Sequence, residues 1–202
     1  MPETAPPRSA TGADLRHAIL DEARRLLVAV GYPNLSMRKI ADAVGCSATS
    51  IYLHFDGKDA LVHALIGEGM SRLYETLQAA DPGGDPVARL NAMSRAYVAF
   101  GLENPELYEV MFQLHPERMA RFPAEDYRRA RRNLDLFESV LASGAEAGVL
   151  DAQPTPEVAA HALWTALHGL VSLRLAGRVD VRLAADAFTA AAVERAVRAF
   201  RA

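Results

Sequence analysis

The segment from Ser36 to Leu61 constrains the fold more than any other part of the chain, because it predicts two short helices joined by a tight turn. Ser36 can cap the first helix, and Gly45 can adopt the left-handed backbone conformation that ends one. The apolar residues between them follow the i, i+3, i+4, i+7 spacing of one helix face: Met37, Ile40, Ala41 and Val44.

The second half of the segment predicts a helix with one buried apolar side and an outer side that carries few charged residues. Ser47 can cap this helix, and Ile51 and Phe55 lie four residues apart on its inner face. Residues 56–57 interrupt it, and Lys58 begins the next helix. The remaining side chains are small, hydroxyl-bearing or aromatic with a polar tip, as in a helix that lies in a nucleic-acid groove: Ala48, Thr49, Ser50, Tyr52 and His54.

Four sequence features occur here together at a fixed spacing. They are the run Tyr52-x-His54-Phe55-x-x-Lys58-x-x-Leu61, the run Met37-Arg38-Lys39-Ile40-Ala41, Gly45 between the helices, and Gly31-Tyr32 before them. Over residues 19–65 this combination resembles the DNA-binding domain of the TetR family of bacterial transcriptional regulators. A helical hairpin without a role in DNA binding is the alternative interpretation.

The resemblance implies which side chains contact DNA. Arg38 is expected to reach a base edge or an adjacent phosphate, and Thr49 and Ser50 are expected to approach bases in the major groove. The only two lysines among the 22 basic residues, Lys39 and Lys58, both fall in this segment, and their flexible ammonium groups suit phosphate. The full expected interface is Ser36, Arg38, Lys39, Ser47, Thr49, Ser50, Tyr52, His54 and Lys58.

Composition restricts the class of protein without identifying it. The chain has 202 residues, half of them apolar, and a net charge of −3, so it can bury a core and is no polycation. Its single cysteine, Cys46, excludes an internal disulfide and gives no zinc cluster; we expect a packing residue rather than a redox sensor. The Pro-rich, polar start lacks the pattern of a signal peptide, and no apolar run approaches the ~18 residues of a membrane span. A cytoplasmic protein without membrane association or cofactor is therefore expected.

The chain after its N-terminal tail predicts an all-α fold, because it shows helical periodicity and no strand pattern. We expect a disordered tail at residues 1–11, a helix-turn-helix domain at 12–57, a connecting helix at 58–80, and a ligand-binding and dimerisation domain at 81–202. The helices outside the helix-turn-helix are expected at about 13–30, 58–79, 87–101, 105–113, 124–147, 156–176 and 181–200.

The C-terminal helices carry a second resemblance. The run Trp164-x-x-x-His168-Gly169-Leu170-x-x-Leu173 is similar to the tryptophan-histidine-glycine pattern of the ligand-binding, dimer-forming domain in one TetR subgroup. The segment is also apolar on nearly all sides, so it is expected to be buried on more than one face. A partner subunit is the natural second face, and an entirely intrachain core is the alternative. The expected dimer contacts are Leu167, Leu170, Leu173 and Phe188.

Two further clusters have a simple structural interpretation. His161 and His168 lie seven residues apart on one helix face, too few ligands for a closed metal site, so packing or a pocket wall is the favoured interpretation. The run of arginines at 128–132 has acidic residues one turn away on both sides, which favours an ion-paired, solvated face over a second DNA contact.

The middle helices are rich in aromatic residues and methionine, a composition that fits either a plain core or a pocket wall. Because the resemblance implies a family of ligand-responsive regulators, we expect an apolar or aromatic small-molecule effector. The expected wall consists of Leu73, Tyr97, Phe100, Tyr108, Met111, Phe112, His115, Trp164 and His168.

The sequence therefore predicts a homodimeric repressor that binds a palindrome-like double-stranded DNA operator and leaves it when the effector binds. An activator or a ligand-independent regulator of the same fold is the closest alternative. An enzyme is disfavoured, because the chain has no G-x-S-x-G, P-loop, G-x-G-x-x-G, H-E-x-x-H or Cys-x-x-Cys motif. A helical scaffold that binds only protein is the third possibility.

Overall fold

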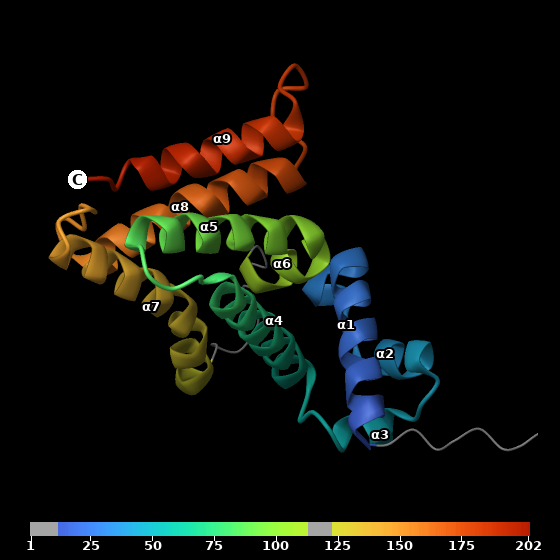
Figure 1. The fold of residues 1–202 in the computed structure, drawn as a ribbon. Helices are drawn as coiled ribbons and strands as arrows, with labels where there is room; N and C mark the ends of the chain where they lie inside the picture. Colours follow the sequence, from blue (N-terminus) through green and yellow to red (C-terminus); the bar gives the residue numbers. More distant parts are fainter. Residues whose placement is uncertain (1–11, 113–122) are drawn as a thin grey trace, which may run out of the picture.

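The computed structural model of the chain describes residues 12–112 and 123–202 (Figure 1), and within these residues every element of regular secondary structure is a helix. One isolated bridge joins Leu150 to Arg201. The all-α prediction is confirmed for the described residues. The helices are α1 (Gly12–Asn34), α2 (Met37–Val44), α3 (Ala48–Tyr52), α4 (Lys58–Ala80), α5 (Pro86–Glu103), α6 (Pro105–Phe112), α7 (Ala124–Glu146), α8 (Pro156–Leu175) and α9 (Ala185–Arg198).

Both short helices begin at the residues that the sequence indicated, and α2 also ends there, whereas α3 ends at Tyr52, before the predicted interruption at residues 56–57. The Ser36 hydroxyl accepts a hydrogen bond from the Lys39 amide at 3.3 Å, and the Ser47 hydroxyl accepts one from the Ser50 amide at 3.0 Å. Gly45 has a φ of 78°, and its amide donates to a carbonyl of the last turn of α2. A residue with a Cβ would be strained at that φ, so the turn between α2 and α3 depends on this glycine.

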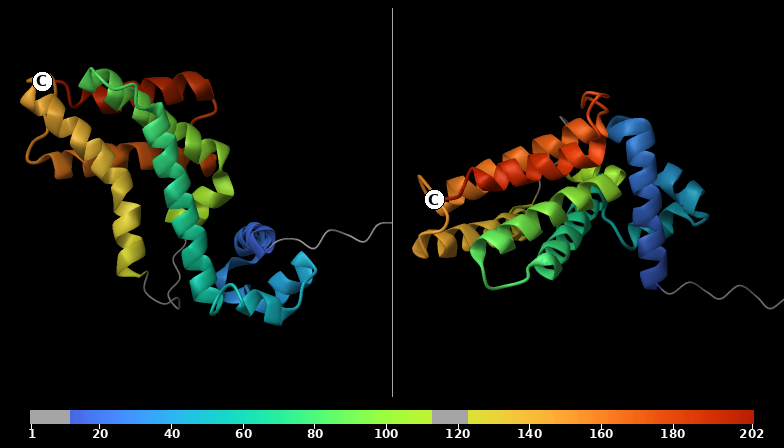
Figure 2. Two further views of the ribbon diagram at one scale, coloured as in Figure 1. Left: turned by 60° about the horizontal axis from the view of Figure 1, so that its bottom comes forward. Right: turned by 45° about the horizontal axis from the view of Figure 1, so that its top comes forward.

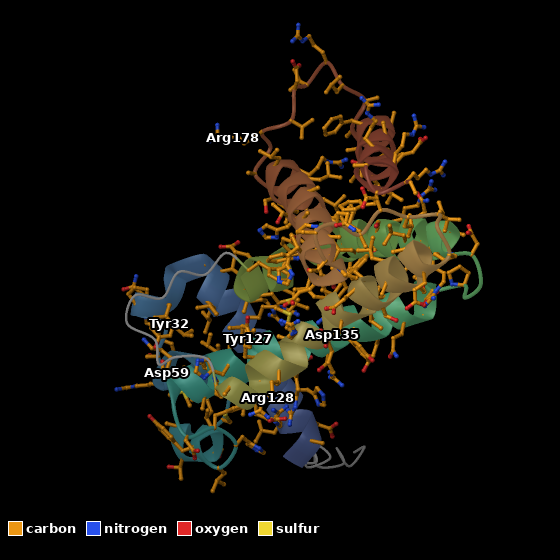
Figure 3. The ribbon with its side chains drawn as sticks, turned by 90° about the vertical axis from the view of Figure 1, so that its left-hand side faces the viewer. Tyr32, Asp59, Tyr127, Arg128, Asp135 and Arg178 are labelled. Atoms are coloured by element: carbon orange, nitrogen blue, oxygen red, sulfur yellow. The ribbon has the colours of Figure 1, made fainter. Side chains whose placement is uncertain are left out.

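The end of α1 is fastened to the start of α4. Gly31 interrupts α1 with a φ of 72°, at the position where the sequence predicted the helix to end. The next residue, Tyr32, is buried, and its hydroxyl donates to the carboxylate of Asp59 (Figure 3). The Lys58 ammonium donates to the Tyr32 carbonyl at 3.0 Å and lies 4.0 Å from the centre of its ring. These contacts fix the orientation of α4 relative to α1–α3.

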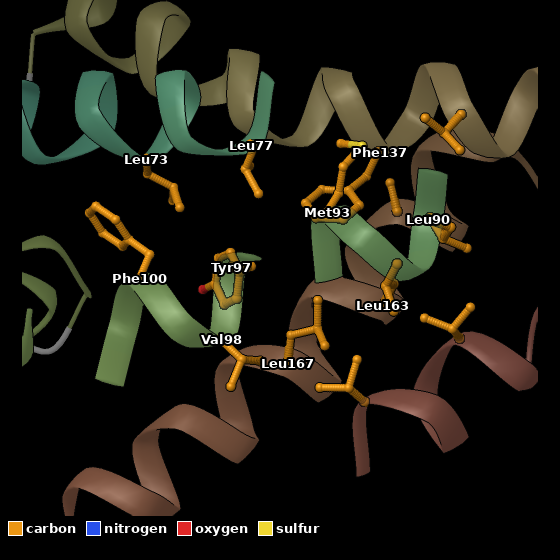
Figure 4. Close-up of a cluster of buried hydrophobic side chains, with 14 of the residues drawn as sticks. Leu73, Leu77, Leu90, Met93, Tyr97, Val98, Phe100, Phe137, Leu163 and Leu167 are labelled. Carbon is orange, nitrogen blue, oxygen red and sulfur yellow. The ribbon is translucent and has the colours of Figure 1, made fainter. Parts of the chain in front are cut away.

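Buried apolar side chains form two clusters that divide within α4. The N-terminal core combines α1, α2, α3 and the first half of α4 as far as Leu65, together with Val110 of α6. The C-terminal core begins at Leu73 and contains residues of α4 to α9. Figure 4 shows Leu73 and Leu77 of α4 facing side chains of α5 in this second core. Both α4 and α6 therefore contribute side chains to both cores.

Two glycines allow neighbouring helices to approach closely. A Cβ at Gly69 of α4 would lie 2.5 Å from the Met111 sulfur of α6, and a Cβ at Gly101 of α5 would lie 2.6 Å from a methyl of Val171 of α8. Both distances are shorter than any normal carbon contact, so a larger residue at either position would push helices apart. The close packing of α4 against α6 and of α5 against α8 therefore depends on these two glycines.

Helices α8 and α9 lie side by side at the end of the molecule away from α2 and α3 (Figure 2). Two of the expected dimer contacts, Leu167 and Leu170, are only 1% and 7% exposed and belong to the chain's own core. Leu173 of α8 is 51% exposed, and Phe188 of α9 is half-buried against the core. The alternative of an intrachain core thus holds for one face of α8.

The start of the last helix also differs from the prediction. Helix α9 begins at Ala185 rather than near residue 181. The Asp180 carboxylate accepts a hydrogen bond from the Arg182 amide at 2.9 Å, and the Asp180 carbonyl accepts one from the Leu183 amide at 3.0 Å. An aspartate that bonds to the backbone two residues later stabilises a turn in competition with a helix.

Candidate functional site

The residues expected to contact DNA lie on the outer side of the α2–α3 pair and at the start of α4. Ile51 and Phe55 are 0% and 5% exposed and anchor α3 to the N-terminal core, which turns its other faces outward. None of the expected contact residues is buried. Arg38, Lys39, Ser47, Thr49 and Tyr52 are exposed, and Ser36, Ser50, His54 and Lys58 are half-buried.

Tyr52 has an exposed ring. Tyr52 is 54% exposed, so its ring does not pack in the core of the helix-turn-helix. The next residue, Leu53, is 81% exposed at the end of the recognition helix and was not expected to contact DNA. An apolar side chain at this place can meet a sugar or a thymine methyl, a contact that no motif of polar residues would have indicated.

The serine and lysine side chains of this surface form hydrogen bonds with backbone groups, and some of their donor protons remain available for a further contact. Ser36 and Ser47 accept hydrogen bonds from amides, which leaves the hydroxyl proton of Ser36 for an outside acceptor. The Ser47 and Ser50 hydroxyls share one hydrogen bond at 2.7 Å. The Lys39 ammonium donates to the Asn34 carbonyl at 2.9 Å, and Lys58 donates to Tyr32. Each ammonium has three donors, so both can still bind phosphate while their position is fixed.

A cavity of about 540 Å³ lies in the C-terminal part between α4, α5, α6, α7 and α8. Five of the expected wall residues line it: Leu73, Tyr97, Met111, Phe112 and Trp164. The sequence did not anticipate the share contributed by α7: Tyr127, Ala130, Arg131, Asn133, Leu134 and Phe137. Asn133 was detectable in principle, because it lies four residues before Phe137 and seven before Val140, on the inward face of α7.

Four expected wall residues are not part of this lining. Phe100 packs into the core and borders a shallow surface depression beside Arg72 instead. Tyr108 and His168 contact Phe112 and Trp164 through their rings, and their polar atoms bind to one another and not to the cavity. His115 lies outside the described residues.

Tyr108 and His168 belong to a chain of hydrogen bonds that joins α5, α6 and α8. The Trp164 indole donates to the Tyr97 hydroxyl at 2.9 Å, the hydroxyls of Tyr97 and Tyr108 are 2.9 Å apart, and the Tyr108 hydroxyl lies 2.6 Å from Nδ1 of His168. Nε2 of His168 lies 3.4 Å from the Ser172 hydroxyl. Because an indole can only donate, Trp164 is the donor to Tyr97, and the remaining bonds can run in the same direction toward Ser172.

Burial of this network keeps its members neutral. Burial lowers the pKa of His168, so its ring is neutral at neutral pH, and in the tautomer that carries the proton on Nε2 its Nδ1 can accept from Tyr108. Burial also raises the pKa of Tyr97 to about 12, although its bonds to Tyr108 and Trp164 act in the opposite direction. The polar tips behind the cavity wall are therefore paired with one another.

The arginines of α7 form ion pairs, as the sequence predicted. Arg128 lies 2.6 Å from Glu125 and Arg129 lies 3.7 Å from Asp126, all with exposed or partly exposed side chains (Figure 3). Arg131, which borders the cavity, contacts the three carboxylates Asp135, Glu138 and Glu157 at 3.3, 3.7 and 2.9 Å. The guanidinium in the cavity lining is therefore already neutralised.

Residues 12–112 and 123–202 contain neither a metal-binding cluster nor a membrane-spanning helix. No group of three or more metal-ligating side chains lies close enough to hold a metal ion. In the same residues, no helix combines the length and the apolar character that crossing a bilayer requires.

Comparison with known protein families gives the same division of the chain. Residues 19–65 match the family described as "Bacterial regulatory proteins, tetR family". Residues 90–200, more than half of the chain, match "Tetracyclin repressor-like, C-terminal domain". The chain belongs to the TetR family. This is a family of DNA-binding transcriptional regulators, which supports the prediction that the protein is not an enzyme.

Curated relatives are similar over a part of the chain. The HTH-type transcriptional repressor Rv1474c of Mycobacterium tuberculosis is 41% identical over 58 residues, which are 29% of this chain and 31% of the relative. The tetracycline repressor protein class D of Escherichia coli is 35% identical over 80 residues, 39% of this chain and 37% of the relative. The alignments thus span about a third of the length of these repressors.

Solved structures are similar over nearly the whole chain. A protein of unknown function from Rhodococcus sp. RHA1 has a TM-score of 0.80 at 24% identity, covering 98% of this chain and 100% of that one. A TetR family transcription regulator from Marinobacter aquaeolei VT8 has a TM-score of 0.76 at 21% identity, covering 93% and 95%. At these identities the likeness establishes the TetR fold.

Proposed function

We propose that this protein is a dimeric transcriptional repressor that binds a palindrome-like operator through α2 and α3 and releases it when an apolar or aromatic molecule enters the cavity. The observation that carries the proposal is the outward face of the capped α2–α3 pair, where hydroxyl, aromatic and basic side chains remain exposed while Ile51 and Phe55 anchor the helix. An electrophoretic gel shift with the DNA that flanks its own gene tests it directly. Retarded DNA is expected at low salt, and no retardation with any flanking fragment would remove DNA binding from the proposal.

Two arginines provide a matched test of the DNA contact. Arg38 lies at the start of α2 on the proposed interface, while Arg178 lies far from it in the exposed turn after α8 (Figure 3). Arg38→Ala is expected to weaken operator binding about tenfold or more, because a base contact is lost. Arg178→Ala removes the same charge and is expected to leave binding unchanged. Equal effects of the two substitutions would indicate that only net charge matters.

Lys58 and Thr49 separate the two kinds of DNA contact. Lys58→Ala is expected to weaken binding about equally on all sequences and to reduce the salt dependence by roughly one counterion. Thr49→Ala is expected instead to relax the sequence preference. Filter-binding titrations over a series of salt concentrations measure both. A Lys58→Ala variant with an unchanged salt slope would remove Lys58 from the phosphate contacts.

Dimerisation is assigned to the exposed face of α8 and to α9. Family members typically act as dimers. The outer face of α8 carries Val158 and Leu173, which are 48% and 51% exposed, with small residues between them. A two-fold axis along this face would place two recognition helices in successive major grooves, about 34–36 Å apart. Leu173→Glu is expected to give a monomer in sedimentation velocity, whereas Val181→Glu in the exposed turn before α9 is the matched control and should remain dimeric.

The effector is expected to act through α4, because this helix contributes to both cores and borders the cavity. A bound molecule can shift the recognition helices only if it prefers the state that does not bind DNA. A preference of about 1–3 kcal/mol changes operator affinity roughly 5–150-fold. Leu73→Trp should fill the cavity from α4 and abolish the ligand response while operator binding is retained. Loss of operator binding in this variant, or a ligand response equal to that of the wild type, would contradict the assignment.

Regulation without a ligand and activation remain the competing functions of the same fold. Deleting the gene is expected to raise transcription from the adjacent operator, as for a repressor. A fall in transcription would instead identify an activator.

A further inference from the structure

The cavity wall contains one buried polar group whose bonding is incomplete. Asn133 of α7 borders the cavity and is only 7% exposed. Its side-chain nitrogen donates to two carbonyls, that of Met70 of α4 at 3.1 Å and that of Ala130 at 3.0 Å. Its side-chain oxygen, Oδ1, is buried and has no hydrogen-bond partner among the described residues. Buried polar atoms are nearly always paired, so this oxygen needs a specific explanation.

The two carbonyls determine which end of the amide is left over. A carbonyl can only accept, so the group that faces Met70 and Ala130 must be the nitrogen with its two protons. A reversed amide would place an oxygen against two oxygens and lose both bonds. The unpaired atom is therefore an acceptor, and only a donor can satisfy it.

The remaining polar groups of the wall do not compete for the same ligand group. The Tyr97 hydroxyl and the Trp164 indole bind to each other and to the network behind the wall. The Arg131 guanidinium is held by three carboxylates. Two further polar side chains border the cavity: Tyr127 is 64% exposed, and Nδ1 of His161 lies 2.8 Å from the Glu157 carbonyl. The rest of the lining is largely apolar and aromatic.

We propose that Asn133 selects the effector: Oδ1 accepts a hydrogen bond from a single O–H or N–H group on an otherwise apolar, uncharged molecule, of which an aryl alcohol is the simplest example. This inference rests on the proposed effector cavity and narrows the chemistry of its ligand. A cavity of about 540 Å³ is within the usual size of small-molecule sites. A ligand without a donor leaves Oδ1 buried and unpaired, which weakens its binding relative to a ligand that pairs it.

The test compares matched probes that differ in one group. Isothermal titration calorimetry with the full chain measures 2-naphthol against 2-methylnaphthalene, and 4-phenylphenol against 4-methylbiphenyl and 4-methoxybiphenyl. If the cavity wall offered no hydrogen-bond partner, the hydroxyl group of a probe would reduce its affinity, because the cost of desolvating the hydroxyl would not be compensated. We expect each hydroxyl probe to bind the wild type about tenfold more tightly than its methyl analogue. The methoxy probe, which has an acceptor but no donor, should bind no better than the methyl probe.

Asn133→Leu removes the acceptor with little change in volume. Met70 and Ala130 lie inside α4 and α7, where their carbonyls also accept helical hydrogen bonds, so the substitution leaves no unpaired acceptor. In this variant the preference for the hydroxyl probes should disappear while the methyl probes keep their affinity. Asn91→Leu on α5 is the matched control, because Asn91 donates to its own helix and does not border the cavity. It should retain the wild-type preference.

Each result supports or overturns the proposal. If the methyl and hydroxyl probes bind with equal affinity to the wild type, or if Asn133→Leu keeps the preference for hydroxyl probes, the proposed role of Asn133 is wrong. The proposed effector cavity is not contradicted by either result. If no probe binds, or if Leu73→Trp does not block binding, the assignment of the cavity as the effector site is wrong, and the proposed role of Asn133 is wrong as well. The comparison of probes within the wild type decides the question even if Asn133→Leu does not fold.

Discussion

The two parts of the molecule use polar side chains in opposite ways. In the helix-turn-helix, serine caps bond to amides three residues later and the remaining polar groups face outward. In the C-terminal part, the Tyr108–His168 and Tyr97–Trp164 bonds join residues 60 and 67 positions apart, and the groups are largely buried. The comparison shows that local hydrogen bonds order the exposed α2–α3 surface, where an external partner can bind. In the C-terminal part, polar side chains instead bond helices of the fold to one another.

The largest expected effect separates a buried leucine from an exposed one on the same helix. Leu167→Glu places an unpaired charge in the C-terminal core and should lower the free energy of unfolding by about 4 kcal/mol. Leu173→Glu, 51% exposed, should change this free energy by less than about 0.5 kcal/mol per monomer. Urea denaturation of both variants, carried out under monomeric conditions, measures the difference. A well-folded Leu167→Glu protein would show that α8 packs differently in solution.

The network should be more sensitive than the caps, because removal of the Tyr108 hydroxyl leaves the Tyr97 hydroxyl and Nδ1 of His168 each with one hydrogen bond fewer. Tyr108→Phe is expected to cost about 1–3 kcal/mol of stability. Tyr74→Phe on α4, whose ring lies under Arg132, provides a control with the same chemical change. Equal stability of Tyr108→Phe and the wild type would mean that the network contributes no net free energy.

A cap substitution tests the N-terminal side of the comparison. Ser47→Ala removes the acceptor for the Ser50 amide and should cost about 1 kcal/mol. Ser47→Asp preserves an acceptor and should recover most of this stability, although its negative charge should weaken DNA binding. Thermal denaturation followed by circular dichroism gives both values. A loss as large as that of Tyr108→Phe would remove the proposed contrast between the two regions.

The smallest expected effect is a dependence of stability on pH through His168. Burial lowers its pKa in the folded protein below the usual value near 6.5, so the unfolded chain binds a proton more readily. Stability is therefore complete above about pH 6.5 and decreases as the pH falls from there to the folded-state pKa. His168→Asn should flatten this part of the stability profile, measured by urea denaturation between pH 5 and 8. An identical slope in the variant would assign the dependence to other groups.

The sequence was sufficient where the stabilising contacts are local. Ser36, Ser47 and Gly45 act within a few residues of their own positions, so the starts of α2 and α3, the end of α2 and the exposed face of α3 could be predicted from spacing alone. The burial of Leu167 and the open oxygen of Asn133 depend on helices that meet across more than sixty residues, where periodicity gives only a face and not its partner. The start of α9 was missed for a different reason, because a side-chain bond at Asp180 outweighs the apolar spacing after it.

Helix α6 limits how regulators of this fold can be recombined. Its Val110 is 1% exposed and completes the N-terminal core, and Glu106 lies 3.5 Å from Arg24 of α1. A chimera that exchanges residues 12–57 alone would pair a foreign α1 with the native α6 and leave that core mismatched. Chimeric repressors built to give one effector a new operator should therefore transplant residues 105–112 together with residues 12–57, even though 47 residues of sequence separate the two segments.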